Sequence, residues 1–179
     1  MKTYVLIIFL VHFISIGKGQ PKAADSNYPT AIKQQAEIMG EFMVKKDFKG
    51  LAKYTYPKIV TMMGGDSMMA AKLEEGFNKM EAAGYKFLSV HFGEPSKVIF
   101  NEKEIQCTVP QILEMKVPNG RIVATSALIG ISLDNGNNWY FIDASSAKDI
   151  QTLRETFPNL SSALVVPEKK QPTFFKDTQ

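Results

Sequence analysis

Two side chains in this sequence could serve as the general base of a proton-transfer reaction, Asp143 and His91. Such a reaction needs a base in a dry pocket and hydrogen-bond donors for the developing oxyanion, which Tyr54, Tyr56 and Tyr85 could supply. Structural roles compete with catalysis at both positions. Asp143 precedes Ala-Ser-Ser and can begin a turn or helix, and His91 alternates with apolar residues of a strand-like run. We therefore expect structural roles, and keep both residues as the catalytic candidates.

Two polar residues, Gln111 and Thr125, interrupt long apolar runs. If the apolar side of those runs faces the core, both side chains need hydrogen-bond partners. A bound ligand or a water molecule could provide them. A hydrogen bond between the two residues, across neighbouring strands, is the simpler alternative. Both residues are candidates for ligand binding.

Four methionines flank the Gly64-Gly65 turn: Met62, Met63, Met68 and Met69. Thioethers bind Cu(I), but no second cluster of soft ligands accompanies these residues. Methionine commonly fills irregular apolar gaps and suits a pocket that accepts varied ligands. The sequence therefore predicts that they line a core or pocket, with Met62 and Met69 as ligand-binding candidates. It predicts no metal site and no cofactor.

The stretch SLDNGNNW, residues 132–139, fits the pattern Ser-x-Asp-x-Gly-x-x-Trp. It resembles the Asp-box of sialidases and other glycan-processing β-propellers. A propeller needs several blades of about 40 residues or more, whereas this sequence has one such motif and no internal repeat. Asn, Asp and Gly tolerate positive φ and are typical of hairpin connections. We expect a hairpin in which Asp134 accepts hydrogen bonds from loop amides, Ser132 assists it and Trp139 covers the turn.

The elements that must position these residues begin with three helices. Apolar residues recur at helical spacing over residues 30–46, then over 47–56, and again over 66–84. Asp47 is placed to cap the second helix. Pro57 breaks or kinks it and can open a fresh turn, PKIVTMM, which Gly64-Gly65 ends.

From residue 85 the apolar period changes to two, which predicts five strands. Two long runs, over residues 105–117 and 123–133, carry their apolar side chains at odd positions, and we expect all of these to face the helices. Pro110 is expected at a bulge or an edge, and Pro118-Asn119-Gly120 predicts the hairpin between the runs. A short helix follows residues 146–149 and ends before Pro158.

This order of elements over about residues 30–157 resembles the nuclear-transport-factor-two-like superfamily of α+β cones, in its small secreted bacterial form. The resemblance implies three N-terminal helices packed in the concave face of a curved, mostly antiparallel sheet of four to five strands, with a short C-terminal helix. A cystatin-like sheet wrapped on fewer helices is the nearest alternative. Members often hold a hydrophobic cavity between helices and sheet. Some are isomerases, dehydratases or polyketide cyclases, many are binding or assembly modules, and some form dimers through the sheet.

The N-terminus has the layout of a secretory signal peptide. Lys2 precedes an apolar run over residues 4–16, and the small residues Gly17 and Gly19 stand before a cleavage point. An uncleaved anchor is the alternative, although a membrane-spanning helix needs about 20 apolar residues. The predicted organisation is a signal peptide over 1–19, a linker over 20–29, one domain over 30–166 and a flexible tail over 167–179. The predicted location is secreted or periplasmic.

Composition indicates a globular domain, with 45% hydrophobic and 22% charged residues among 179. Loss of Lys2 and Lys18 with the signal peptide would leave 19 basic residues against 18 acidic ones. No basic cluster interleaves with aromatic residues, so a nucleic-acid surface is not predicted. Cys107 is the single cysteine and cannot form an internal disulfide; a buried thiol is expected.

The function that the sequence favours is a secreted, non-enzymatic binding or assembly module. Its hydrophobic cavity would hold a small apolar or amphipathic ligand, or its sheet would meet a protein partner or a second copy of the chain. The alternative is an isomerase or dehydratase that uses Asp143 or His91 as general base. No membrane span is expected after removal of the signal peptide.

Overall fold

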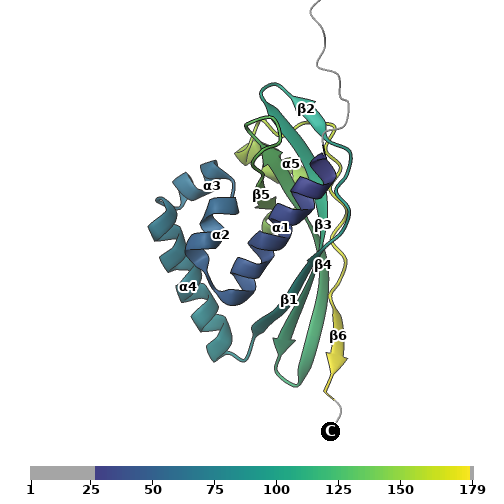
Figure 1. Cartoon of the computed structure of the whole chain (residues 1–179). Helices are drawn as coiled ribbons and strands as arrows, with labels where there is room; N and C mark the ends of the chain where they lie inside the picture. Colours follow the sequence, from purple (N-terminus) through teal and green to yellow (C-terminus); the bar gives the residue numbers. More distant parts are fainter. Residues whose placement is uncertain (1–26, 178–179) are drawn as a thin grey trace, which may run out of the picture.

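The computed structural model describes residues 27–177, and these form an α+β fold in which helices pack on one side of a six-stranded antiparallel sheet. Figure 1 shows α1 to α4 together on one side of the sheet, and β6 on the opposite edge of the view. The predicted signal peptide, residues 1–19, lies outside the described residues. None of the helices within 27–177 has the length and apolar character that crossing a membrane would require.

Four helices precede the sheet, one more than predicted, because Pro57 starts a separate helix. Asp47 caps α2 as expected, accepting a hydrogen bond from the amide of Gly50 at 2.8 Å. Gly64 and Gly65 both have positive φ, which ends α3 and lets the chain turn into α4. The helices are α1 (Tyr28–Lys45), α2 (Phe48–Tyr54), α3 (Pro57–Met62) and α4 (Asp66–Ala82).

The sheet has the order β1-β3-β4-β5. In addition, β2 pairs with β3 along the same edge as β1, and β6 pairs with β4 along the same edge as β5. Every pairing is antiparallel. Pro110 lies in β3 where β1 has ended and β2 has not begun, so its missing amide hydrogen leaves no gap in a ladder. The strands are β1 (Lys86–Phe92), β2 (Ile99–Asn101), β3 (Glu104–Val117), β4 (Gly120–Ser132), β5 (Tyr140–Asp143) and β6 (Thr173–Lys176).

The register between β3 and β4 corrects the prediction that all odd-numbered apolar residues face the helices. The pairs include Val109 with Leu128 and Thr108 with Ile129, so odd positions of β3 share a face with even positions of β4. We call the side that carries Val109 and Leu128 the helix face, because both belong to the cluster packed against α1 and α2. Ile129 and Ile131 are fully buried on the other side, the outer face.

Part of the outer face is covered by the chain that follows the sheet. After a short 3-10 helix at Ala144–Ser146, Asp149 caps α5 (Ile150–Thr156) through the amide of Thr152 at 2.9 Å. As predicted, this helix ends before Pro158. Leu153 of α5, with Phe157, Leu160 and Leu164 after it, forms an apolar cluster with the outer-face residues of β4. Both faces of β4 are therefore buried over residues 127–132, which explains why the apolar run is nearly continuous there.

Polar side chains fasten this C-terminal segment to the sheet. Gln106 is fully buried; its amide nitrogen donates to the carbonyl oxygen of Asn159 at 2.9 Å, and its oxygen accepts from the amide of Ser161 at 2.9 Å. Thr108 donates to the carbonyl oxygen of Val165 at 2.9 Å. Because both lie at even positions of β3, they share the outer face with Ile129 and Ile131.

The segment predicted as a flexible tail, residues 167–179, contains a strand at Thr173–Lys176. These residues form β6 and pair with Gly120–Val123 of β4. The guanidinium of Arg121 lies 4.4 Å from the ring centre of Phe175 in the facing strand. The free edge of β4 at this end of the sheet offers unpaired backbone groups, and the tail satisfies them.

The stretch at residues 132–139 is the predicted hairpin brace between β4 and β5. The Ser132 hydroxyl accepts from the amide of Gly136 at 2.8 Å and donates to Asp134 at 3.0 Å. Asp134 also accepts from the backbone amide of Asn138 at 2.9 Å. Although burial alone would raise it, these hydrogen bonds lower the pKa of Asp134 below its ordinary value. Trp139 is buried behind the turn, as expected.

Candidate functional site

A cavity of about 570 Å³ lies between the helices and the helix face of the sheet. α1 packs against β1, and α2 reaches β5, where Thr55 forms a bridge with Phe141. The space left between these contacts is bounded mainly by apolar side chains from α1 to α4, β4 and β5. Five methionines contribute to it: Met39, Met43, Met62, Met63 and Met69. A volume of this size is within the range of pockets that hold drug-sized ligands.

The close approach of α1 to β1 depends on Gly40. A side chain at this position would place its Cβ 2.8 Å from the Phe92 ring, so only glycine allows the helix to lie this close. On the other side of the cavity, α3 and the Gly64-Gly65 turn bring Met62 and Met63 to the wall. Met62 is 62% exposed and Met69 is 4% exposed, so the wall runs from the solvent to the interior.

Gln111 is the polar residue that lies deepest in this wall. It stands in the middle of the sheet on the helix face, opposite Phe92 of β1 and Ser126 of β4. Gln111 is 7% exposed, and its side-chain amide makes no hydrogen bond to any of residues 27–177. Ser126 is half-buried and its hydroxyl likewise has no partner among these residues. The amide nitrogen and oxygen of Gln111 are not fully enclosed and face the open volume of the cavity.

Asp143 and Ser146 are the exposed polar residues of the cavity wall and mark its mouth. The Asp143 carboxylate accepts a hydrogen bond from the amide of Ser145 at 2.8 Å, which is the helix-entry role expected from the sequence. The Ser146 hydroxyl donates to the carbonyl oxygen of Asp143 at 2.6 Å. Asp143 pairs with Leu128 of β4, which lies two residues from Ser126, the β4 partner of Gln111. Strand geometry then separates the Cα atoms of Gln111 and Asp143 by about 12 Å.

Two predicted site residues lie away from the cavity. Thr125 pairs with Ile112 and is exposed on the outer face, so the predicted hydrogen bond between Gln111 and Thr125 is wrong. The cause is the β3–β4 register, which puts these two odd positions on opposite faces. His91 also pairs with Ile112 and is exposed. It borders a separate open groove of about 490 Å³ between α1 and β1.

The three tyrosines considered as donors do not line the cavity. Tyr56 donates to Glu104 at 3.1 Å, and burial together with this carboxylate raises the pKa of Tyr56 to about 12. Tyr54 packs on Phe42, and Tyr85 is exposed beyond the end of α4. The geometry expected of a base with oxyanion donors is therefore not assembled from these residues.

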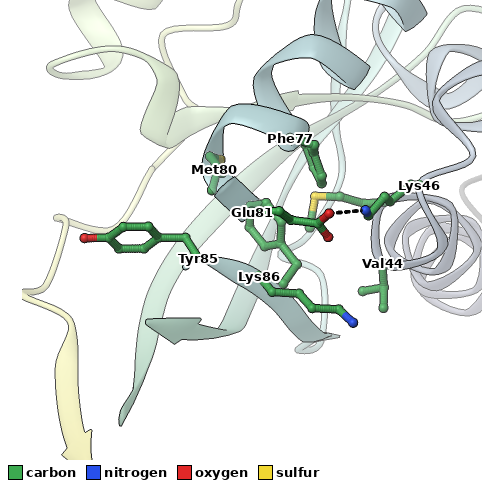
Figure 2. Close-up of a pocket in the computed structure, with 9 residues that line it drawn as sticks. Val44, Lys46, Phe77, Met80, Glu81, Tyr85 and Lys86 are labelled. Atoms are coloured by element: carbon green, nitrogen blue, oxygen red, sulfur yellow. Dashed lines mark hydrogen bonds and ion pairs between the residues drawn. The ribbon is translucent and has the colours of Figure 1, made fainter. Parts of the chain in front are cut away.

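Beyond the cavity, α1 and α4 are joined near the start of β1. Figure 2 shows the ion pair between Lys46 and Glu81, 2.5 Å in length, with Phe77 and Met80 beside it. Met43 borders both the small recess drawn there, about 10 Å³, and the larger cavity. This recess is too small for a ligand, and the ion pair serves to hold the two helices together.

The remaining sulfur residues fit structural roles. Cys107 is fully buried in the cluster against α1, and burial raises the pKa of its thiol to about 12. Met68 is 51% exposed and is not part of the cavity wall. Within residues 27–177, no three or more His, Cys, Asp or Glu side chains gather in a way that could hold a metal ion.

The sequence matches no family model and no curated protein. Among solved structures, the chain is similar to a domain of unknown function with a cystatin-like fold from Nostoc punctiforme. The two share 11% sequence identity, the match covers 77% of this chain and 90% of that chain, and the TM-score is 0.36. This likeness carries no information about a ligand or a reaction.

Of the predicted ligand-binding residues, the structure brings Gln111, Met62 and Met69 together in one wall and leaves Thr125 outside it. Leu128, Phe141 and Phe157 also line the cavity and were not named from the sequence as site residues. Leu128 would have been found by reading β4 from its even positions, which requires knowing the hairpin register.

Proposed function

We propose that this protein is a binding module that holds a small apolar or amphipathic molecule between its helices and its sheet. The observation that carries the proposal is the 570 Å³ cavity, whose wall is apolar except for a few placed polar groups, chiefly Gln111. Ligand sites commonly combine such a wall with a small number of polar groups that fix orientation. We also infer, from the order of its elements, that the chain is a nuclear-transport-factor-two-like protein and, from the layout of its N-terminus, that it is secreted or periplasmic.

The expected affinity is moderate. A ligand of about 20 non-hydrogen atoms at about 0.3 kcal/mol per atom gains roughly 6 kcal/mol, which corresponds to a Kd on the order of tens of micromolar. The methionine side chains support binding of more than one apolar shape, because a thioether chain is flexible and polarisable.

Catalysis in the same cavity would have one candidate base, Asp143, because His91 lies in the separate groove. Asp143 is exposed at the mouth and already caps the turn after β5. A binding role needs no chemistry from Asp143. Replacing Asp143 with Asn is therefore expected to leave ligand affinity within about twofold, whereas an isomerase or dehydratase would lose its base.

Cavity filling tests the proposal. N-phenyl-1-naphthylamine, a neutral probe that fluoresces in apolar surroundings, is titrated into the protein and into Met63→Trp, which places a larger side chain in the cavity wall. Met68→Trp is the matched control, because Met68 is exposed outside that wall. We expect saturable binding to the unmodified protein and to Met68→Trp, and at least tenfold weaker binding to Met63→Trp. Circular dichroism verifies that both variants fold. Absence of saturable binding to the unmodified protein would overturn the proposal.

A further inference from the structure

The side-chain amide of Gln111 is a recognition group without a partner in the described chain. A glutamine side chain offers two donor hydrogens and an acceptor oxygen with two lone pairs. At Gln111 none of these is used by residues 27–177, although the residue is more than nine-tenths buried and lines the cavity. The amide atoms of Gln111 are not sealed in the core, so they are open to a molecule that enters the cavity.

The position of Gln111 is fixed by the sheet. β3 is paired on both sides at this point, with Phe92 of β1 opposite Gln111 on one side and Ser126 of β4 opposite it on the other. Cross-strand partners share a face, so Ser126 lies on the same face as Gln111, although only Gln111 lines the cavity. Gln111 is a polar point on a mainly apolar floor.

The charges around the cavity restrict what this polar point can bind. Among the described residues of the wall there is no Lys, Arg or His, and the single ionisable group is Asp143 at the mouth. An ionised carboxylate at the floor would be buried without a cation, and an ammonium there would be buried without a carboxylate; both are strongly disfavoured. A neutral group that both donates and accepts hydrogen bonds can pair with the acceptor oxygen and the donor hydrogens of the Gln111 amide.

We propose that Gln111 is a ligand-binding residue that selects neutral amphipathic molecules, with a hydroxyl or primary amide head group on Gln111 and the hydrocarbon part directed past the methionines to the mouth. This inference rests on the proposed function and deepens it, because it names the ligand class and its orientation in the same cavity.

The test is a head-group series of constant chain length: decanol, decanamide, decanoate and decylammonium. Each compound is used to displace N-phenyl-1-naphthylamine from the full-length protein at pH 7. The concentration of each compound stays below its own critical micelle concentration. We expect decanol and decanamide to bind about tenfold or more tightly than the two ions. In Gln111→Leu the decanamide affinity, corrected for the probe affinity measured on the same variant, falls about tenfold, equivalent to 1.4 kcal/mol. In Gln111→Glu the preference shifts toward decylammonium, because a carboxylate now stands at the floor.

Thr125→Val is the matched control, because Thr125 is exposed on the opposite face of the neighbouring strand; its affinities are expected to equal those of the unmodified protein. If the probe binds but all four head groups displace it equally, the inference is overturned and the cavity function stands. If nothing binds, the proposed function fails first. If a variant does not fold, the comparison of the four head groups on the unmodified protein still tests the preference for neutral head groups.

Discussion

The same substitution at two glutamines of β3 should change stability by very different amounts. Gln106 and Gln111 are both buried, but on opposite faces. Gln106 takes part in hydrogen bonds with Glu104, Asn159 and Ser161, whereas Gln111 has no partner among the described residues. Leucine has a similar volume and no polar atoms. Its effect therefore depends on whether the amide it replaces was satisfied.

For Gln106→Leu, three hydrogen bonds are lost. The Glu104 carboxylate and the Ser161 amide each lose a partner, whereas the Asn159 carbonyl oxygen keeps its bond from Asn101. At about 1 kcal/mol for each lost bond, the free energy of unfolding should fall by roughly 3 kcal/mol. Gln111→Leu loses no hydrogen bond within residues 27–177, and the amide that it removes borders the open cavity rather than being sealed in the core. The free energy of unfolding should therefore change by less than about 1 kcal/mol. In a domain of this size these changes correspond to roughly 2–4 °C in Tm per kcal/mol.

Urea unfolding of the ligand-free protein, followed by Trp139 fluorescence, measures both changes. The slope of unfolding free energy against urea should be the same in all three proteins, which confirms that only stability has changed. If Gln111→Leu destabilises the protein to the same degree as Gln106→Leu, then the Gln111 amide is already satisfied in the ligand-free state. Its assignment as a recognition group would then lose its basis.

Three further predictions concern other parts of the fold. Gly136→Ala should destabilise by about 2–3 kcal/mol in thermal unfolding, because φ is +89° and the new Cβ would lie 2.2 Å from the Tyr28 ring; Gly76→Ala, with open space around it, should be neutral or stabilising. The lowered pKa of Asp134 contributes stability that is present above the ordinary value of about 3.9 and is lost as pH falls through the lower folded-state pKa. The stability difference between the protein and Asp134→Asn should therefore shrink from pH 5 toward pH 3 in urea titrations. Cys107, with its pKa near 12, should resist a thiol reagent such as dithionitrobenzoate at pH 8 until urea unfolds the chain, and rapid labelling of native protein would contradict its burial.

Features set by a few neighbouring residues could be predicted from the sequence. The hairpin at residues 132–139 formed as expected because Ser132, Asp134 and Gly136 bond within the same loop. The Asp47 cap and the start of α3 at Pro57 depend likewise on adjacent residues. In each case the deciding interaction spans four residues or fewer.

The faces of the strands could not be predicted in the same way. The turn at Pro118-Asn119 pairs Val117 with Gly120, which places odd positions of β3 beside even positions of β4. A register shifted by one residue would exchange the two faces of β4, and its apolar run would look the same in the sequence. In β1, a bulge between Phe87 and Ser89 has the same effect, since it leaves Leu88 exposed where the alternation predicted a buried residue.

The two faces of the sheet have different roles: the outer face contributes to stability, and the helix face carries the proposed binding site. On the outer face, the cluster around Ile129 and Leu153 and the hydrogen bonds of Gln106 hold β3 and β4 against the C-terminal segment. That packing fixes the sheet without contributions from the cavity. Behind Gln111 the outer face is not closed, since Ile112 and Thr125 are exposed there. Farther along β4, beside Leu128, the cavity lies on one side of the strand and the packed C-terminal segment on the other, so the closed outer face supports the open volume at that point.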